Sequence, residues 1–508
     1  MLSLLILIGA LILGYLYIRS TQKFDYWEKQ GIKTRSPCYP FVGTLWKVWK
    51  RLNFASEWLL IFQVMVVDDL KDIKTYGKLI GLFEGTRPYL FCADPDIIRD
   101  VFIKNFDHFV NRREAMFTDE YMKKMLSALQ GDEWKEARKR LSPMFSSGKI
   151  KNMSILMSEC AETLVSNFKK SMNNEGIVDL KEHFGAFTMD VIATCAFGTK
   201  IDSLGSPHDP FVENAKKAFL NPRIRTPLVL LLLIGNIFSK RLSKMLISNE
   251  VLFFARVSKS IADQRRKEKL RERGDMIDLL LELQEEEQKE CEADPTKTPV
   301  ITEEFMVAQM MIFFLAGFDT SATTLTMVMY SLALNPDVQD KVVDEIKERV
   351  VQYGGINHEM VNDCPYLDQV IQETLRLYPP AFRTERTCNK PCEIRGVKFE
   401  KGVRIAFPIY AIHHNPEFYE DPEEFRPDRF AQSEKVLRHP MIYLPFGHGP
   451  RNCIGMRFAL TEIKLALCHV LSQLKASRSP QTQVPVETAP SLGFFLPVNV
   501  KVKLEARE

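Results

Sequence analysis

The chain has 508 residues, of which 45% are hydrophobic, enough to form a large buried core. Its formal net charge is only +3, which argues against the strongly basic surface typical of nucleic-acid-binding proteins. The ten cysteines are scattered singly, which indicates reduced thiols in a protein that faces the cytosol. Cys388 and Cys392 lie near each other, but no second ligand pair accompanies them, so a zinc site there is disfavoured.

Residues 1–18 form an uncharged apolar segment at the N-terminus. Its length is at the lower limit for a membrane-spanning helix. It lacks a basic start and a small-residue cleavage site, and Arg19 and Lys23 follow it, so an uncleaved signal anchor is predicted. Positive charge on this flank predicts that the body of the protein stays on the cytosolic side of the membrane. The membrane is predicted to be that of the endoplasmic reticulum. A buried core helix is the weaker alternative.

Two short strands are expected at residues 76–83 and 87–93, followed by a helix that begins near Pro95. A further helix is expected around residues 130–140, where Trp134 and Arg138 lie one turn apart on the same face. The rest of this helix is basic, with Lys135, Lys139 and Arg140. That basic face has two interpretations, a solvated surface or a docking surface for an acidic redox partner.

Residues 155–290 have mostly helical periodicity, and a helix is expected to end at Gly198. Residues 227–238 form a second apolar segment, too short to span a bilayer. It could belong to the core, but shallow insertion into the membrane that holds the N-terminal anchor is the preferred interpretation. The charged stretches 265–273 and 282–292 predict an exposed loop.

The longest apolar helix is expected over residues 301–335, with Thr302 as the N-cap and Pro336 as the stop. It is apolar nearly all round, so it should cross the protein interior. Asp319 and Thr320 lie in its middle. Burying polar groups in an apolar interior costs free energy, so their presence calls for an explanation. The structural alternative is a threonine bonded to its own helix beside a solvated aspartate. The functional hypothesis is proton delivery into the interior.

An acid and a base, Glu373 and Arg376, share one face of a later helix, and Arg429 follows downstream. A buried pair of this kind is stable only with good geometry and further partners. Taken alone, this Glu-x-x-Arg pattern is uninformative about function. Strand-like segments follow at residues 392–399 and 403–408.

Residues 445–455 combine one cysteine, Cys453, with several glycines, and a helical pattern starts immediately afterwards. A sulfur at a helix N-terminus is favoured as a thiolate, and the glycines allow a large flat group to approach the backbone. A cysteine without neighbouring Cys or His ligands cannot complete a zinc site, but it can be the axial ligand of a haem iron. The alternative is an ordinary buried cysteine after a turn.

The complete pattern Phe-Gly-x-Gly-x-Arg-x-Cys-x-Gly at residues 446–455 resembles the haem-thiolate loop of the cytochromes P-450. Residues 449–460 are especially similar to the animal microsomal clan that contains the mammalian drug-oxidising third family. The other motifs occur in the order of that family. The resemblance implies a mainly α fold, one helical haem-binding domain with a small β-rich region. The expected organisation is an anchor at 1–18, a basic, proline-rich linker at 19–43 and a catalytic domain at 44–508.

The resemblance also implies roles for individual residues. Cys453 would be the axial ligand of the iron of haem b, and Asp319 and Thr320 would be the catalytic pair for oxygen activation. The expected haem contacts are Arg112, Trp134, Arg138, Arg386, Arg451 and Phe446. The expected structural triad is Glu373, Arg376 and Arg429. The candidate walls of an apolar substrate pocket are Phe117, Phe313, Leu315, Ala316, Phe382, Phe494 and Phe495.

The implied reaction is insertion of one oxygen atom of O2 into apolar small molecules such as xenobiotics, steroids or fatty acids. Electrons would come from NADPH through a membrane-bound cytochrome P-450 reductase, with cytochrome b5 as a second candidate donor. Two alternatives stay open: a haem-thiolate isomerase or dehydratase of lipid peroxides, and a non-catalytic haem or lipid carrier. The presence of both Asp319 and Thr320 argues against the isomerase, which needs no proton relay.

Overall fold

The structure is a computed structural model, and it describes residues 2–44, 61–113, 120–172, 175–206, 208–220, 249–268, 275–489 and 494–507. The helices are α1 (Leu2–Thr21), α3 (Ile61–Tyr76), α4 (Pro95–Arg99), α5 (Glu120–Lys124), α6 (Gly131–Leu141), α7 (Ser147–Ser171), α8 (Leu180–Phe197), α9 (Pro210–Leu220), α12 (Asn249–Glu268), α13 (Met276–Ala293), α14 (Glu303–Leu334), α15 (Pro336–Tyr353), α16 (His358–Asn362), α17 (Pro365–Leu377), α18 (Ile409–His413), α19 (Gln432–Leu437) and α20 (Met456–Gln473). The single helical turns are η1 (Glu28–Gln30), η3 (Asp100–Lys104), η4 (Phe106–His108), η5 (Ser142–Phe145), η6 (Pro427–Phe430) and η7 (Pro440–Ile442). The strands are β1 (Leu79–Glu84), β2 (Arg87–Cys92), β3 (Ile177–Asp179), β4 (Thr384–Thr387), β5 (Cys392–Ile394), β6 (Val397–Phe399), β7 (Arg404–Phe407), β8 (Leu474–Ser477) and β9 (Lys501–Ala506). The mainly helical fold expected from the sequence is confirmed.

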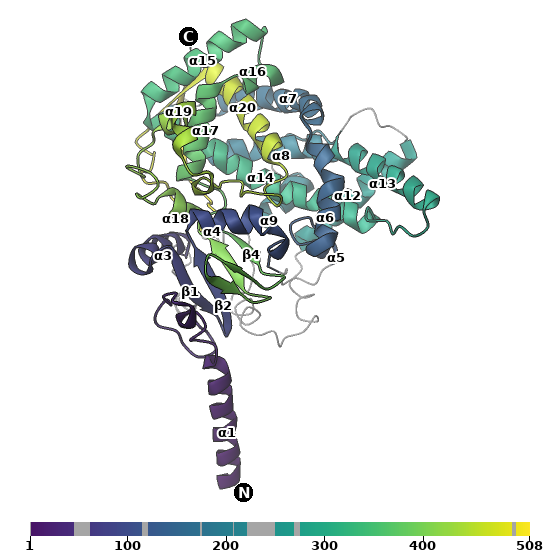
Figure 1. The fold of residues 1–508 in the computed structure, drawn as a ribbon. Helices are drawn as coiled ribbons and strands as arrows, with labels where there is room; N and C mark the ends of the chain where they lie inside the picture. Colours follow the sequence, from purple (N-terminus) through teal and green to yellow (C-terminus); the bar gives the residue numbers. More distant parts are fainter. Residues whose placement is uncertain are drawn as a thin grey trace.

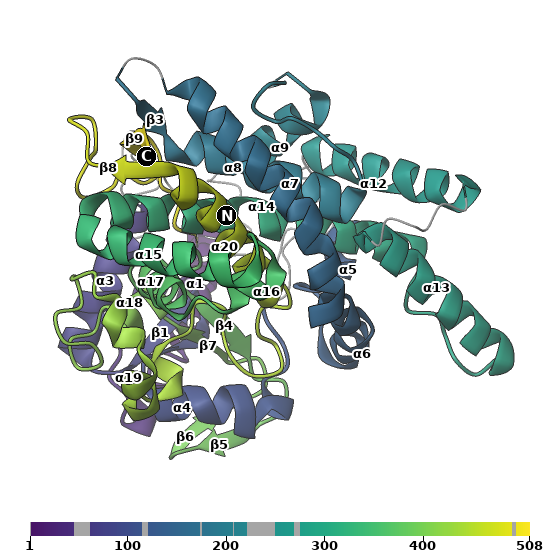
Figure 2. The ribbon, with the colours of Figure 1, turned by 90° about the horizontal axis from the view of Figure 1, so that it is seen from above.

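Helix α14 crosses the middle of the molecule and packs against α8, α12, α17 and α20 (Figure 2). Thr302 caps its N-terminus by accepting a hydrogen bond from the Phe305 N–H at 3.2 Å, and Pro336 begins the next helix. Its length and hydropathy would also suit a membrane span, but most of its surface is buried within the protein. The predicted core helix is therefore confirmed, including both of its ends.

The largest sheet among the described residues has the strand order β1-β2-β7-β4. Strands β1 and β2 form the expected hairpin, and β2 runs parallel to β7 with Tyr89 opposite Arg404. Strand β4 pairs antiparallel with β7, which sets Arg386 opposite Ile405. This pairing joins residues far apart in the sequence and holds β4 at the border between the sheet and the helices (Figure 1).

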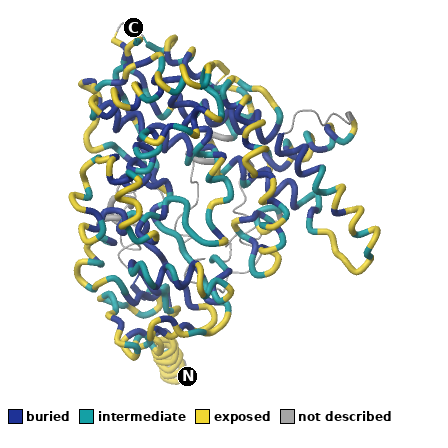
Figure 3. The backbone as a smooth tube through the Cα atoms, turned by 45° about the horizontal axis from the view of Figure 1, so that its top comes forward, coloured by how far each residue is buried: buried dark blue, intermediate teal, exposed yellow. Residues whose placement is uncertain are grey.

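Helix α1 projects from the end of the molecule that carries β1 and β2, and the C-terminus lies at the opposite end (Figure 1). Its residues are exposed along most of the helix (Figure 3). They include large apolar side chains such as Leu11 and Leu13. Exposed apolar area of this extent is unfavourable in water, and a lipid environment would remove the penalty.

The charged segment 282–292 is helical, so the predicted exposed loop is wrong at that position. Helix α13 continues through it because Glu287 is buried and accepts hydrogen bonds from the backbone N–H groups of Val300 and Ile301 at 3.0 and 2.6 Å. These bonds tie the acidic helix to the segment that leads into α14. The second apolar segment, 227–238, lies outside the described residues.

Candidate active site

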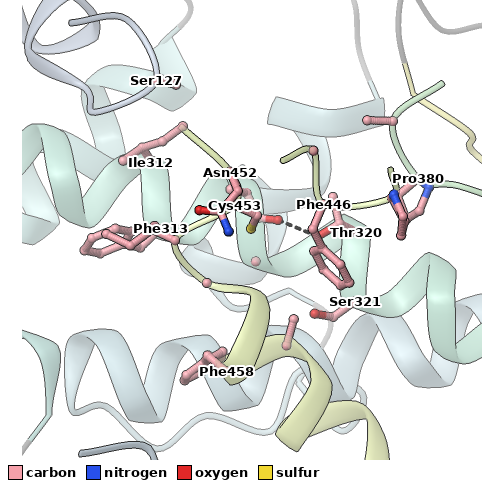
Figure 4. A pocket seen from close by; sticks show the side chains of 18 of the residues that line it. Ser127, Ile312, Phe313, Thr320, Ser321, Pro380, Phe446, Asn452, Cys453 and Phe458 are labelled. Carbon is pink, nitrogen blue, oxygen red and sulfur yellow. Dashed lines mark hydrogen bonds between the residues drawn. The ribbon is translucent and has the colours of Figure 1, made fainter. Parts of the chain in front are cut away.

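A cavity of about 430 Å³ lies between α14, the start of α20 and the loop that carries Cys453 (Figure 4). Its walls are mainly apolar, as in most small-molecule sites. Segments widely separated in the sequence contribute to it, including residues 126–127, 380–384 and 445–455. The cysteine loop, the pair Trp134 and Arg138, and Thr320 therefore meet around one cavity.

The loop of Cys453 is held by its own backbone. The Cys453 N–H donates to the Phe446 carbonyl at 2.9 Å, and α20 begins three residues after the cysteine. Gly449 has a φ of 74°, and a Cβ atom there would overlap with the carbonyl oxygen of Phe102. Any other residue at 449 would therefore be strained twice, by its backbone angle and by this contact.

All ten cysteines lie in the described residues, and Cys453 alone is exposed. The surface that it exposes faces the cavity (Figure 4). Burial within the protein raises the pKa of its thiol, whereas the Gly455 N–H and the charges of Arg138 and Arg112 lower it. The described residues contain no group of three or more His, Cys, Asp or Glu side chains that could bind a metal ion together. Cys453 is thus suited to be the single protein ligand of a metal held by something else.

Guanidinium groups gather beside this sulfur. Arg138 donates to the backbone and side-chain oxygens of Asn452 at 3.0 and 2.9 Å. Arg451 lies over the Trp134 ring at 4.8 Å and donates to the backbone carbonyls of Val110 and Leu129. These bonds fasten the cysteine loop to the segment around α6 and turn several cationic side chains toward the cavity.

Arg112, Arg386 and Arg451 form a cationic cluster, in which Arg386 and Arg451 are buried and Arg112 is partly buried. Burial lowers the pKa of all three, and the neighbouring guanidinium groups lower the pKa of Arg386 and Arg451 further, that of Arg451 to about 9. Their Nε atoms have no hydrogen-bond partner among the described residues. Glu385 is an acidic neighbour, but burial raises the pKa of its own carboxyl group.

A buried cluster of cations with unsatisfied donors is unstable unless anions join it. Haem carries two propionates, and guanidinium groups bind carboxylates well. The lone cysteine, the glycine-lined backbone and the cationic cluster therefore all fit a haem. Arg386 lies behind the cavity wall, where its guanidinium stacks over Phe102 at 4.7 Å.

The side chains of Asp319 and Thr320, in the middle of α14, lie on different sides of the helix. Thr320 lines the cavity, and its hydroxyl donates to the Ala316 carbonyl at 2.6 Å. Asp319 lies outside the cavity wall, where its carboxylate is 2.7 Å from the Nζ atom of Lys181. Lys181 also donates to the Thr323 hydroxyl at 2.9 Å. The carboxylate is therefore held on the side of α14 that faces α8, away from the cavity.

The Glu373, Arg376 and Arg429 side chains meet in the core. Arg376 binds both oxygens of Glu373 at 2.8 Å, and Arg429 reaches the same carboxylate at 3.3 Å. Arg376 also donates to the backbone carbonyls of His413, Pro422 and Glu424. The network is well satisfied, as a buried ion pair must be. It supports the segment that leads to the cysteine loop and contributes nothing to the cavity wall.

The candidate substrate residues divide between the cavity and its surroundings. Those that line the cavity are Phe313, Ala316 and Phe494, together with the predicted haem contact Phe446. Those that lie outside its wall are Leu315, Phe382 and Phe495. Phe382 and Phe495 are buried in the core instead. Phe117 lies outside the described residues.

Several cavity residues were not found from the sequence, namely Ser127, Ile312, Ser321, Thr324, Arg383 and Thr384. Thr324 could have been found, because it follows Thr320 by one helical turn and so shares its face. Arg383 could not, since its position depends on an ion pair with Asp69, which is 314 residues earlier.

A lone cysteine beside a cation-rich cavity under a long core helix fits a haem-thiolate protein, and comparison with known proteins gives the family. The family model described as Cytochrome P450 matches residues 53–504. Mouse (Mus musculus) cytochrome P450 3A11 is 36% identical over 483 residues, which cover 94% of this chain and 92% of that protein. Pig (Sus scrofa) cytochrome P450 3A29 is 37% identical over 487 residues, or 95% and 92%. Human cytochrome P450 3A5 is 36% identical over 488 residues, with the same coverage.

The chain therefore belongs to the cytochrome P450 family. It is an oxidoreductase that binds haem b and incorporates oxygen from O2, as a monooxygenase. Proteins of this family work with a redox partner and act in general on apolar molecules. The family, fold, enzyme class and cofactor expected from the sequence are confirmed.

Proposed function

We propose that this monooxygenase oxidises apolar small molecules of the xenobiotic, steroid or fatty-acid classes, with electrons that come from NADPH through a membrane-bound flavoprotein reductase. The observation that carries the proposal is that Cys453 and Thr320 line the same mainly apolar cavity. When bound, haem supplies the activation of O2 and the transfer of one oxygen atom to the substrate. The residues of the chain bind this group, exclude water from the cavity and transfer protons to it.

Cys453 would ligate the iron as a thiolate, and Arg138 and Arg112 would favour its negative charge. Arg112, Arg386 and Arg451 would hold the propionates, and Trp134 supports Arg451 through ring stacking. Binding relieves the mutual repulsion of the guanidinium groups. Haem binding and the stability of this region are therefore coupled.

Thr320 presents a hydroxyl at the cavity surface, and Asp319 supplies protons to it from the side of α14 that faces α8. The bond from Thr320 to the Ala316 carbonyl orients this hydroxyl. The ion pair of Asp319 with Lys181 must open, or pass a proton, during each cycle. The substrate lies against Phe313, Ala316 and Phe494, which exclude water from the reacting atoms.

The chain is proposed to be held at the endoplasmic reticulum by residues 1–18, with 19–43 as a linker and 44–508 as the catalytic domain on the cytosolic side. The exposed apolar surface of α1 supports the anchor, and Arg19 and Lys23 support the orientation. Lys139 on α6 is exposed, and Lys135 pairs with Asp107 on the surface at 2.9 Å. This basic face is the proposed docking surface for the acidic reductase, and cytochrome b5 would compete for it.

The ligand assignment is tested by Cys453→Ser in the full-length protein. The reduced CO complex of the unaltered protein should show the red-shifted Soret band of a thiolate ligand, and the variant should lack it. A variant that keeps the band would contradict the assignment. Arg138→Gln is a useful control, because it should weaken haem binding without removing the band.

The reaction is tested by a product screen with reductase, NADPH and a panel of fatty acids, steroids and xenobiotics. Thr320→Ala should divert electrons from product to released hydrogen peroxide, because the hydroxyl that hands on protons is gone. Unchanged product per NADPH would count against the relay. Turnover of a lipid hydroperoxide without NADPH, with no NADPH-dependent product, would favour an isomerase instead. Haem binding without NADPH consumption would favour a carrier.

A further inference from the structure

Cys364 and Cys468 are two buried thiols that the proposed reaction does not use. Cys364 stands directly before α17, and Cys468 lies on α20, the helix that follows the Cys453 loop. The two cysteines are far apart in the sequence, yet they belong to one core cluster, in the region where α16 and α20 pack together (Figure 2). A hydrogen bond joins their side chains. The fold therefore places two thiols next to each other.

The surroundings of Cys364 favour its thiolate form. It occupies the N-cap position of α17, where the helix dipole and the free N–H groups stabilise negative charge. The hydrogen bond with the Cys468 thiol lowers the pKa of Cys364. Burial and the Glu345 carboxylate raise that pKa, and the charges of Lys464 and Arg349 lower it. The pKa of Cys468 is raised by the same hydrogen bond and by burial. One sulfur is thus prepared to act as a nucleophile, and the other stays a thiol.

Cys364 lies just beneath the surface of the protein. Its side chain is buried and, as a thiol, donates to the Met360 carbonyl at 3.3 Å. Asn362 and Pro365, close to it on either side in the chain, are exposed. The cysteine belongs to the connection between α16 and α17, and such connections open more readily than the interiors of helices. A small local opening therefore exposes this sulfur to a molecule of the size of hydrogen peroxide.

A purely structural role does not account for this arrangement. A structural cysteine behaves as a small apolar residue, and burial raises the pKa of its thiol, as it does for Cys92 and Cys195. Cys388 and Cys392 are also hydrogen-bonded to each other, but burial raises the pKa of both. Cys364 instead combines a lowered pKa with a second thiol beside it. This combination is typical of cysteines that react with oxidants.

We propose that Cys364 and Cys468 are a redox-active pair that hydrogen peroxide converts into a reversible disulfide. The Cys364 thiolate attacks peroxide, the O–O bond breaks, and the sulfur becomes a sulfenic acid, while the departing hydroxide takes up a proton to form water. The Cys468 sulfur then attacks the Cys364 sulfur, the S–O bond breaks, and the proton of Cys468 leaves with the hydroxide as a second water. The two thiols lose two electrons, and peroxide gains them. This inference is independent of the proposed function, because it needs no substrate, NADPH or reductase.

The disulfide would tie α20 to the start of α17. Helix α20 begins three residues after Cys453, and α17 carries Glu373 and Arg376 of the buried ionic network. A covalent link between segments far apart in the sequence reduces the freedom of the unfolded chain. The oxidised protein should therefore unfold at a higher urea concentration than the reduced protein.

The bond is tested on the full-length, haem-loaded protein, treated with hydrogen peroxide at doses that leave the Soret absorbance unchanged. After quenching with an alkylating agent and digestion without reductant, mass spectrometry should find the peptides of Cys364 and Cys468 joined, with the loss of two hydrogen atoms. Dithiothreitol should separate them again. Cys388→Ser, which removes a thiol from the second hydrogen-bonded pair, is the matched control and should leave the bond intact. Absence of the joined peptide at all of these doses would overturn the proposal.

Single variants test which sulfur is attacked first. Cys468→Ser should stop at the sulfenic acid of Cys364, which dimedone traps, because no second thiol remains to form the disulfide. Cys364→Ser should leave Cys468 unlabelled. In the unaltered protein Cys364 should react roughly tenfold or more faster than Cys388, because a pKa of about 12 leaves almost no Cys388 thiolate at pH 7. Equal rates at these two cysteines would contradict the assignment of the nucleophile.

The pairing must also depend on the fold. Protein unfolded in urea before the peroxide is added should form the joined peptide far more slowly, and an equal yield would overturn the proposal. Oxidation should raise the urea midpoint of the unaltered protein and leave that of Cys468→Ser unchanged; equal shifts in both would refute the tie between α17 and α20. If Cys364→Ser fails to fold, the dimedone labelling of Cys468→Ser and the peptide map of the unaltered protein decide the outcome.

Discussion

Replacing Glu462 with glutamine should change how the stability of the protein depends on pH. The ordinary pKa of glutamate is 4.5, and burial raises that of Glu462 to about 8. Below pH 4.5 the group is protonated in both the folded and the unfolded state, so pH has no effect through it. Between pH 4.5 and 8 the unfolded chain releases the proton while the folded protein keeps it, so stability falls as pH rises.

The size of the effect follows from the pKa difference. Each unit corresponds to about 1.4 kcal/mol, so the loss amounts to about 3 kcal/mol at pH 7 and levels off near 5 kcal/mol above pH 8. Glutamine cannot titrate, and its own burial cost does not vary with pH. The free energy of unfolding of Glu462→Gln, relative to the unaltered protein, should therefore rise by about 3 kcal/mol between pH 4.5 and 7.

The measurement is urea unfolding of both proteins at several pH values, followed by far-ultraviolet circular dichroism at equal haem content. All other titrating groups are shared, so the difference between the two curves isolates Glu462. Curves that run parallel from pH 4.5 to 8 would refute the reasoning, because they would mean that the carboxyl group titrates alike in the folded and unfolded states. Glu292→Gln on α13, an exposed glutamate, is the matched control and should give parallel curves.

Two further substitutions test the supports of the site. Arg376→Met should destabilise the protein by about 3–5 kcal/mol in the same unfolding experiment. The reason is that the Glu373 carboxylate stays buried but loses its main partner. A loss of stability below about 1 kcal/mol would contradict this expectation. Gly449→Ala should lower the haem content of the purified protein, measured as Soret absorbance per chain. The added methyl group would overlap with the Phe102 carbonyl and displace the cysteine loop. A normal haem content would show instead that the loop can adapt.

The sequence predicted features whose signal is local. The caps of α14 and the loop of Cys453 depend on neighbours within a few residues, so their residue types reveal them. The order of the motifs then indicated the fold, because it matches a known family. Trp134 and Arg138 were expected on one helix face because one turn separates them, and both line the cavity.

Features that depend on distant partners could not be predicted in this way. Asp319 and Thr320 are adjacent in the sequence, yet Lys181 draws the aspartate away from the cavity across 138 positions. Glu462 reads as an ordinary charged residue on a helix, and only the packing of α7, α8 and α14 around α20 shows that it is buried. Phe382 was expected in the substrate wall by resemblance to the family, but it is buried in the core while its neighbour Ala381 lines the cavity.

The bonds that fasten the cysteine loop also set the order in which this protein can mature. Arg112 reaches the carbonyl of Arg451 across 339 positions, and Arg138 reaches Asn452 across 314. During synthesis the apolar helix α1 emerges first, and Arg112 and Arg138 follow long before Cys453, the proposed iron ligand. With α1 as the proposed anchor, the growing chain would meet the membrane hundreds of residues before it could capture its cofactor, and haem loading would become a late event at the bilayer surface.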